Sequence, residues 1–238
     1  MTRDANIWAI VPAAGAGTRM QSDVPKQYLP LLGRPVIFHT LDRLCSYSRV
    51  RGVFVGITPD DSHWAGLTVP QMTNFLGTFE GGAVRARTVL NGLAALAAHA
   101  QPNDWVMVHD AVRPCVRHAD LEKLATAAFG GADGALLATP VADTVKRSDT
   151  RGRVQETVLR AGLWRALTPQ MFPIGILRDA LNAALATDDD ITDESAAMER
   201  IGARPTLVEG YPDNIKITHP ADLALAELFL KQQAGERA

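Results

Sequence analysis

Residues 7–35 read IWAIVPAAGAGTRMQSDVPKQYLPLLGRP, and this segment indicates the fold class that the rest of the chain follows. The apolar run Ile7–Val11 predicts a buried strand, which ends in the loop of tiny residues Ala13–Gly17. Small residues let a loop backbone approach a ligand closely, with its N–H groups facing phosphate oxygens. Arg19 and Lys26 follow and supply the positive charge that a polyphosphate needs. The segment therefore predicts a phosphate-binding turn after a core strand; a glycine-rich turn without chemistry is the alternative.

The loop matches neither of the two common phosphate-binding motifs. Gly15 and Gly17 fit the dinucleotide-binding pattern G-x-G-x-x-G, but Met20 occupies its third glycine position. Counting the pattern G-x-x-x-x-G-K-[ST] from Gly15 also leads to Met20, and no Lys-Ser or Lys-Thr pair follows. These mismatches argue against a dinucleotide-dependent redox enzyme and predict a different phosphate-binding loop.

Composition and charge narrow the class of protein. The 238 residues, with 47% hydrophobic and 21% charged, are ordinary for a globular protein and can bury a substantial core. A formal net charge of -2 argues against a surface that coats nucleic acid. No apolar run reaches the length of a membrane span, and residues 1–6 lack the apolar core of a signal peptide. Cys45 and Cys115 suit reduced thiols, so we expect a cytoplasmic protein that binds neither nucleic acid nor membrane.

Strand-like and helix-like segments alternate along the chain. The alternation is typical of an α/β protein with a mostly parallel sheet and helices on both of its faces. The expected core strands are Trp8–Pro12, Gly52–Thr58, Trp105–His109, Gly134–Pro140 and Arg204–Glu209. The expected helices lie near Pro35–Tyr47, Val84–Ala98, Ala119–Phe129, Pro173–Ala186, Thr192–Ile201 and Pro220–Gln233. Such sheets bind ligands beyond the carboxyl ends of their strands, where the candidate residues below fall.

Residues 141–160, VADTVKRSDTRGRVQETVLR, do not follow this alternation. They predict two short strands around a polar turn, with charged flanks that offer little to a core. We expect a β-arm over about 141–163, protruding from a single domain that comprises residues 1–238. Isolated hairpins are barely stable in water, so a second subunit is the simplest partner for the arm.

The loop after the strand Trp105–His109 carries the strongest candidates, Asp110 and Arg113. A carboxylate supplies a hard oxygen for Mg²⁺, and an arginine three residues away supplies a bidentate donor for phosphate. The sequence therefore predicts a metal and phosphate site here. A structural ion pair that orders the turn is the alternative.

Three further segments hold candidates whose chemistry the sequence leaves open. Arg85 and Thr88 follow Gly81-Gly82 in the first turns of a predicted helix, which also suits a solvated helical face. The segment Ile191–Ser195 reads as a helix N-cap with acidic residues in the first turn, which capping and the helix dipole already explain. Lys216 lies in a short strand-like segment, Ile215–Thr218, where a solvated lysine is equally consistent.

Several reaction classes lack their sequence signatures. The chain has no G-x-S-x-G elbow, no H-E-x-x-H motif and no cysteine-rich metal cluster. The remaining candidates are several cationic side chains, one carboxylate suited to binding a metal ion, and the glycine turns. These are suited to reaction at phosphorus, where catalysis consists mainly of positioning and charge stabilisation.

The motifs together resemble a known family. In order they are AAGAGTRM, PKQY, GG with a following Arg and Thr, HDAVRP, DTVK, LTPQ, TDE and DNIK. They are similar to the 2-C-methyl-D-erythritol 4-phosphate cytidylyltransferases of the non-mevalonate route to isoprenoids, over about Ile7 to Leu230. The resemblance implies a Rossmann-like nucleotidyltransferase sheet, CTP as co-substrate with Mg²⁺, a sugar-alcohol phosphate as acceptor, and a homodimer formed through the β-arm.

The resemblance also implies roles for individual residues. Catalytic roles fall to Arg19, Lys26, Arg160 and Lys216, with Arg160 reaching the neighbouring subunit's substrate. The CTP pocket comprises Ala13, Ala14, Gly15, Gly17, Gly82, Arg85, Thr88 and Ala111. The acceptor side comprises Asp110, Arg113, Thr144, Thr168, Thr192 and Asp213, with Asp110 also the ligand of Mg²⁺. The family usually has Ser at position 88, and Thr keeps the hydroxyl.

Two alternatives stay open at the level of sequence. Ribitol-5-phosphate cytidylyltransferases share the fold, the CTP site and many of the motifs, so only residues on the sugar side separate the two activities. A non-catalytic nucleotide-binding module on the same fold predicts CTP binding without release of pyrophosphate. The presence of Arg19, Lys26, Asp110 and Lys216 argues against that module.

Overall fold

The structure is a computed structural model that describes residues 5–15, 23–187 and 191–236. Its centre is a seven-stranded sheet in the order β11-β7-β10-β6-β1-β4-β5. The strands of this sheet are β1 (Ile7–Pro12), β4 (Val50–Ile57), β5 (Phe75–Glu80), β6 (Trp105–Val108), β7 (Ala135–Pro140), β10 (Trp164–Pro173) and β11 (Thr206–Glu209). Parallel pairs join β1 to β4 and β6, β4 to β5, and β7 to β11, whereas β10 runs antiparallel to β6 and β7. The mostly parallel α/β sheet is therefore confirmed.

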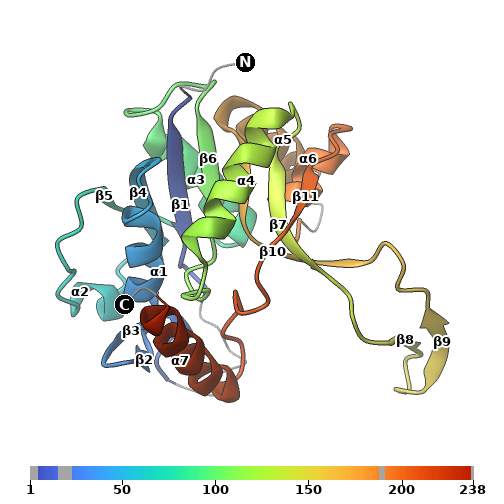
Figure 1. The fold of residues 1–238 in the computed structure, drawn as a ribbon. Helices are drawn as coiled ribbons and strands as arrows, with labels where there is room; N and C mark the ends of the chain where they lie inside the picture. Colours follow the sequence, from blue (N-terminus) through green and yellow to red (C-terminus); the bar gives the residue numbers. More distant parts are fainter. Residues whose placement is uncertain (1–4, 16–22, 188–190, 237–238) are drawn as a thin grey trace.

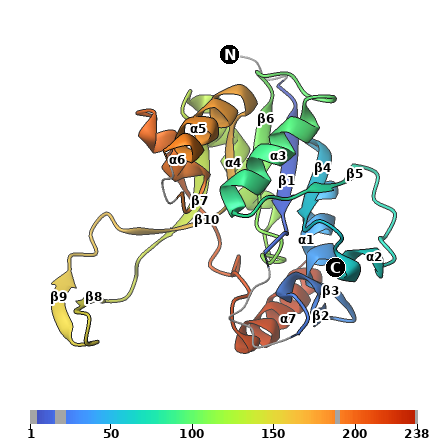
Figure 2. The same cartoon turned by 180° about the vertical axis from the view of Figure 1, so that it is seen from behind.

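Helices cover both faces of the sheet (Figures 1 and 2). On one face lie α1 (Val36–Cys45) and α4 (His118–Gly130), and on the other lie α3 (Arg85–Leu96), α5 (Ile174–Ala186) and α6 (Glu194–Arg200). Side chains of β1 alternate between the two cores: Ala9 and Val11 pack under α1 and α4, and Ile10 packs under α3 and α5. A strand buried on both faces needs a continuous apolar run, which explains the sequence of β1.

Smaller elements close the edge of the sheet at which the parallel strands end. They are the 3-10 helix η2 (Lys26–Tyr28), the short strands β2 (Pro30–Leu31) and β3 (Arg34–Pro35), helix α2 (Ser62–Ala65) and the C-terminal helix α7 (Pro220–Gly235). A third apolar cluster packs α7 onto this edge, with Val112 and Ile217 at its centre. No helix in the described ranges is long and apolar enough to cross a membrane.

A two-stranded hairpin of β8 (Val145–Ser148) and β9 (Val154–Val158) extends away from the sheet (Figure 1). It lies within the segment predicted as an arm. Leu159 and Val154 in this segment are 81% and 67% exposed.

Two local predictions were wrong. The segment Ile215–Thr218 is irregular rather than a strand, because Ile217 donates its N–H to Val112 in a loop and joins no ladder. Strands β5 and β10 were not predicted. Both lie outside the continuous apolar runs, and β10 includes the cis Thr168–Pro169 peptide bond and an irregular register with β7.

Candidate active site

Two adjoining hollows open at the carboxyl edge of the sheet. The first hollow is lined by Pro12, Ala13, Ala14, Gly15, Lys26, Gln27, Gly82, Ala83, Val84, Arg85, Thr88, Asp110, Ala111, Val112 and Lys216. The second hollow is lined by Arg85, Asp110, Arg113, Ala166, Leu167, Thr168, Gln170, Thr192, Asp193 and Lys216. Three residues, Arg85, Asp110 and Lys216, line both and form what we term the shared wall.

The loop after β1 turns its carbonyl groups towards the protein. Gln27, on η2, donates its amide N–H to the carbonyls of Ala13 at 2.7 Å and Gly15 at 3.3 Å. The Thr58 hydroxyl donates to the Ala14 carbonyl between them at 3.1 Å. These bonds hold the loop along the first hollow, which Ala13, Ala14 and Gly15 line.

The opposite side of the first hollow is the turn that enters α3. The Thr88 hydroxyl accepts the N–H of Gly82 at 3.0 Å and closes this turn onto the helix. A Cβ at Gly81 would lie 2.5 Å from the Cβ of Ala14, so only glycine lets the turn pack against the first loop. The two glycine-containing segments therefore meet beside the first hollow, although Ala14 and Gly81 are 67 positions apart in sequence.

Asp110 carries the negative charge of the shared wall. Its carboxylate lies 3.2 Å from Arg85 Nη2, 2.9 Å from Lys216 Nζ and 3.5 Å from Arg113 Nε. Burial of the Asp110 side chain raises its pKa, but the three cations outweigh burial and hold the pKa well below the usual range. Asp110 is therefore surrounded by three positive charges, two from Arg85 and Lys216 of the shared wall and one from Arg113 of the second hollow.

Arg85 is held from a second side by Glu194, the first residue of α6. Arg85 Nη1 lies 2.5 Å from a Glu194 oxygen, and the Glu194 side chain is only 1% exposed. Burial raises the pKa of Glu194, and Arg85 opposes that shift. The pKa of Arg85 is raised because Glu194 and Asp110 together outweigh its own burial.

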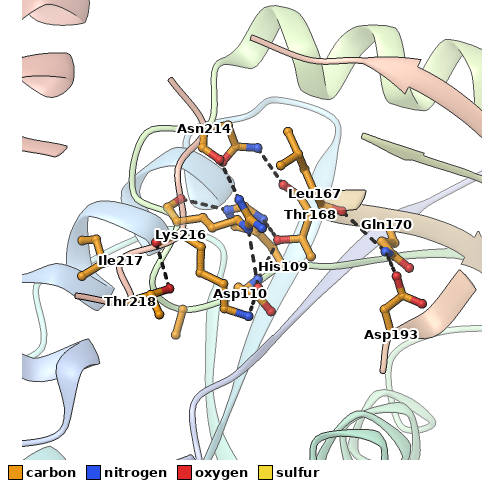
Figure 3. Close-up of polar contacts among 12 residues, drawn as sticks. His109, Asp110, Leu167, Thr168, Gln170, Asp193, Asn214, Lys216, Ile217 and Thr218 are labelled. Carbon is orange, nitrogen blue, oxygen red and sulfur yellow. Dashed lines mark hydrogen bonds and ion pairs between the residues drawn. The ribbon is translucent and has the colours of Figure 1, made fainter. Parts of the chain in front are cut away.

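A buried hydroxyl anchors the loop that carries Asp110 (Figure 3). Thr168 accepts the backbone N–H of Asp110 at 3.0 Å, and its oxygen lies 2.9 Å from His109 Nδ1. His109 Nε2 lies 3.1 Å from the carbonyl of Arg113, which can only accept a proton, so Nδ1 must accept from Thr168. Burial lowers the pKa of His109 to about 4, which keeps this ring neutral near pH 7. His109 is thus a structural support of the site.

The segment that carries Lys216 is fixed by Asn214 (Figure 3). The side-chain amide of Asn214 donates to the Thr168 backbone carbonyl at 2.8 Å, and the backbone carbonyl of Asn214 accepts from Arg113 Nη1 at 2.7 Å. Lys26 Nζ donates to the carbonyl of Ile217 at 3.1 Å. These contacts bring the residues before α1, after β6, on β10 and before α7 to one place.

The far side of the second hollow is formed by the start of α6. Asp193 caps this helix by accepting the N–H of Ala196, which confirms the predicted N-cap. Gln170, on β10, donates to Asp193 at 2.9 Å (Figure 3). Gln170 also accepts the N–H of Ser195 at 2.8 Å. These two bonds hold the start of α6 in place, so that Thr192, the residue before the N-cap, lines the second hollow.

Some predicted site residues lie elsewhere. Thr144 and Arg160 are exposed on the arm and line neither hollow, and Arg160 contacts the carbonyl of Ala142. Asp213 lies outside both hollows because its carboxylate pairs with Arg117 at 2.6 Å and accepts from Gln233 at 2.9 Å. Asp213 is thus held in an ion pair outside both hollows, and its role toward the acceptor stays a prediction. Gly17 and Arg19 lie outside the described residues.

Sequence reasoning missed four supports of the site: Gln27, His109, Glu194 and Asn214. Each is buried and polar, and each lies inside a motif already noted: PKQY, HDAVRP, TDE or DNIK. Buried polar groups need hydrogen-bond partners. A polar or acidic residue inside such a motif could therefore have been predicted to support the site. Their partners could not be inferred, because the contacts join segments far apart in sequence.

The residues fit a magnesium ion that arrives with a triphosphate. Within the described part of the chain, no group of three or more His, Cys, Asp or Glu side chains could hold a metal ion by itself. Mg²⁺ is commonly bound by one or two carboxylates, with phosphate oxygens and waters completing the shell. Asp110 borders both hollows and supplies one such carboxylate.

Fold and site define a class. A mostly parallel sheet with a small-residue loop, two lysines and a carboxylate, Asp110, at its carboxyl edge is the arrangement of a nucleotidyltransferase, an enzyme that moves a nucleoside monophosphate from a nucleoside triphosphate to an acceptor.

Comparison with known proteins identifies the family. The profile of the 2-C-methyl-D-erythritol 4-phosphate cytidylyltransferase family matches residues 7–232, and the chain belongs to this family. The enzyme of that name from Tolumonas auensis is 50% identical over 228 residues, covering 96% of this chain and 98% of its own. The enzyme of that name from Haemophilus influenzae is 48% identical over 230 residues, covering 97% of this chain and 98% of its own.

Solved structures agree with the family. A 4-diphosphocytidyl-2C-methyl-D-erythritol synthase superimposes with a TM-score of 0.84 at 36% identity, covering 96% of this chain and 100% of its own. The 2-C-methyl-D-erythritol 4-phosphate cytidylyltransferase of Francisella tularensis superimposes with a TM-score of 0.82 at 31% identity, covering 94% of this chain and 100% of its own. The resemblance seen in the motifs is confirmed.

Proposed function

We propose that this chain transfers CMP from CTP to 2-C-methyl-D-erythritol 4-phosphate, giving 4-diphosphocytidyl-2-C-methyl-D-erythritol and pyrophosphate, in the non-mevalonate isoprenoid pathway. The observation that carries the proposal is the shared wall of Arg85, Asp110 and Lys216 between two hollows. A transfer between two phosphorylated substrates needs them on either side of one cluster of cations, because both carry negative charge.

CTP occupies the first hollow in this proposal. The loop N–H groups of Ala14 and Gly15 face the nucleotide, and the turn at Gly82 and Thr88 encloses the base. Lys26 lies at the mouth and, with Arg19, neutralises charge on the α-phosphate. Ala111 completes the lining beside the shared wall.

The acceptor occupies the second hollow. Arg113 and Lys216 supply positive charge there, and Thr168, Thr192 and Gln170 make the rest of the lining polar. This chemistry suits a phosphorylated polyol, which offers an anion to the cations and hydroxyl groups to the polar side chains.

The mechanism follows from charge. A phosphate monoester has its second pKa near about 6, so the acceptor is mostly dianionic at neutral pH and needs little help from a general base. Its oxygen attacks the α-phosphorus of CTP in line, and pyrophosphate leaves. Lys26 and Lys216 stabilise the charge that builds up as two polyanions approach, and Arg85, which Glu194 holds, adds a further positive charge. When bound with CTP, Mg²⁺ held by Asp110 adds further charge neutralisation.

The whole chain works as one nucleotidyltransferase domain, and its arm makes a homodimer in the cytoplasm. The support is the projecting hairpin, whose segment exposes Leu159 and Val154. Arg160 and Thr144 lie on the same segment, away from their own chain's hollows, so in this proposal they serve the second hollow of the partner subunit.

A direct assay tests the substrate. Purified protein is incubated with CTP, Mg²⁺ and either 2-C-methyl-D-erythritol 4-phosphate or ribitol 5-phosphate, and pyrophosphate release is followed. The proposal predicts turnover with the methylerythritol phosphate, which the family profile and the named relatives favour. Exclusive use of ribitol phosphate would refute it, and CTP binding without pyrophosphate release would indicate a non-catalytic module.

A further inference from the structure

We infer that Glu194 is the positioning residue for Arg85 and that Arg85, so fixed, acts on the phosphates of both substrates. The inference rests on the proposed function and deepens it. Arg85 borders both hollows, and its guanidinium is bound by Asp110 on one side and by Glu194 on the other.

Helix α6 does not need Glu194 to cap its N-terminus. The N-cap of α6 is Asp193, which already accepts the N–H of Ala196. Glu194 is instead directed inward, with a side chain that is 1% exposed and Arg85 as its ion-pair partner at 2.5 Å. Its second oxygen is buried and has no hydrogen-bond partner in the described part of the chain. Burying a carboxylate in this way is costly, so the contact with Arg85 is the feature that explains it.

The two carboxylates leave Arg85 partly available. Arg85 donates through Nη1 to Glu194, and through Nε and Nη2 to Asp110 at 3.3 and 3.2 Å. A guanidinium has five N–H groups, so these three bonds leave two for a ligand. The Arg85 side chain is 26% exposed, whereas Glu194 is enclosed. Glu194 therefore touches no substrate and acts through Arg85.

This arrangement removes conformational freedom from Arg85 before substrate arrives. A long side chain fixed at two points loses little further entropy when it binds phosphate. Without the charge of Glu194, Asp110 remains as the anionic partner, and the guanidinium turns towards it. Displacement of a charged group beside the reacting phosphates lowers turnover steeply.

A double-mutant cycle tests the inference. The variants are Glu194→Gln, Arg85→Met and the two combined, with Glu199→Gln as the matched control, since Glu199 is an exposed glutamate on the same helix. We expect Glu194→Gln to lower kcat about 10- to 100-fold while the KM of each substrate changes about threefold or less. In the Arg85→Met background the same change should have no further effect. The control should match the wild-type chain.

Three results would overturn the inference: wild-type kcat in Glu194→Gln, an equal loss in both backgrounds, or a loss confined to the KM of one substrate. Thermal denaturation identifies any variant that does not fold. In that case Glu194→Asp is measured instead, because it keeps the negative charge but has a shorter side chain. It must lower kcat while the KM of each substrate is unchanged. A wild-type kcat in Glu194→Asp would refute the inference. If the wild-type chain itself transfers no CMP, the proposed function fails, and crystal structures of the wild-type and Glu194→Gln chains then decide the positioning role: an Arg85 guanidinium that turns towards Asp110 in the variant supports it, and an unmoved guanidinium overturns it.

Discussion

The Lys216 ammonium lies 2.9 Å from the Asp110 carboxylate, within the wall that the two hollows share. Lys216 comes from the irregular segment before α7, and Asp110 follows β6, so the contact joins two distant parts of the chain. The Lys216 side chain is 39% exposed, and Asp110 keeps Arg85 and Arg113 as partners without it. Lys216 is thus placed for a ligand more than for stability.

We therefore expect Lys216→Met to lower kcat about 100-fold or more, because a cation is lost beside the reacting phosphates. The Tm should change by only a few degrees, since a partly exposed ion pair contributes about 0–1 kcal/mol. Steady-state kinetics and calorimetry of one preparation measure both. Lys231→Met removes an exposed lysine of α7 and serves as the control. A kcat within twofold of the wild-type value would remove Lys216 from the mechanism.

Gln27 should control affinity for CTP. Replacing it with Met keeps the length of the side chain but removes the N–H that holds the carbonyls of Ala13 and Gly15. The loss of bonds to a buried loop should raise the Kd for CTP about 10-fold or more. Thr58→Val removes a single hydrogen bond to the same loop, and this bond is more exposed to solvent. It should therefore raise the Kd for CTP less than Gln27→Met does. Unchanged affinity for CTP in Gln27→Met would mean that the loop keeps its conformation without the hydrogen bonds from Gln27.

Thr168 should act as an anchor. Thr168→Val removes the hydroxyl partner of the Asp110 N–H and of His109 Nδ1, which should destabilise the fold by about 1–3 kcal/mol and lower kcat. Thr168→Ser keeps the hydroxyl and should restore both. Urea denaturation and steady-state assays of the two variants make the comparison. If Thr168→Val alters only the KM for the acceptor, the hydroxyl binds substrate rather than the Asp110 loop.

The arm can be tested by mixing inactive chains. Lys26→Ala should lower turnover far more than stability, and Arg160→Ala should disable the site of the partner subunit. A dimer with one chain of each kind then has one intact site. Random exchange of equal amounts should restore activity in about a quarter of all sites. Absence of recovery, although mixed dimers form on a sizing column, would place Arg160 outside any neighbour's site.

The two thiols give a test of packing. Burial raises the pKa of both Cys45 and Cys115 to about 12 from an ordinary value of 9.0. Because the thiolate is the reactive form, alkylation at pH 8 should be about 1,000-fold slower in the folded chain than in urea. The sign for stability follows: above about pH 9 the unfolded chain loses protons more readily, so rising pH destabilises the fold. Equal alkylation rates would show that the thiols are not buried.

Features that local sequence patterns determine could be predicted, whereas features that depend on contacts between distant parts of the chain could not. The continuous apolar runs of β1, β4 and β6 specify buried parallel strands by themselves, and their loops locate the site. The antiparallel strand β10 has no such run, because its place depends on pairing with β6 and β7. Partners such as Glu194 for Arg85 join residues 109 positions apart, and no local pattern specifies them.

The central claim is that a phosphate oxygen of the acceptor attacks the α-phosphorus of CTP. Acceptor labelled with ¹⁸O in its phosphate group, incubated with the wild-type chain, CTP and Mg²⁺, tests this claim directly by mass spectrometry and ³¹P NMR. We predict a diphosphocytidyl product that retains all of the label, including the bridging oxygen, together with unlabelled pyrophosphate. Label in the pyrophosphate, or CMP released without a diphosphate product, would contradict the account.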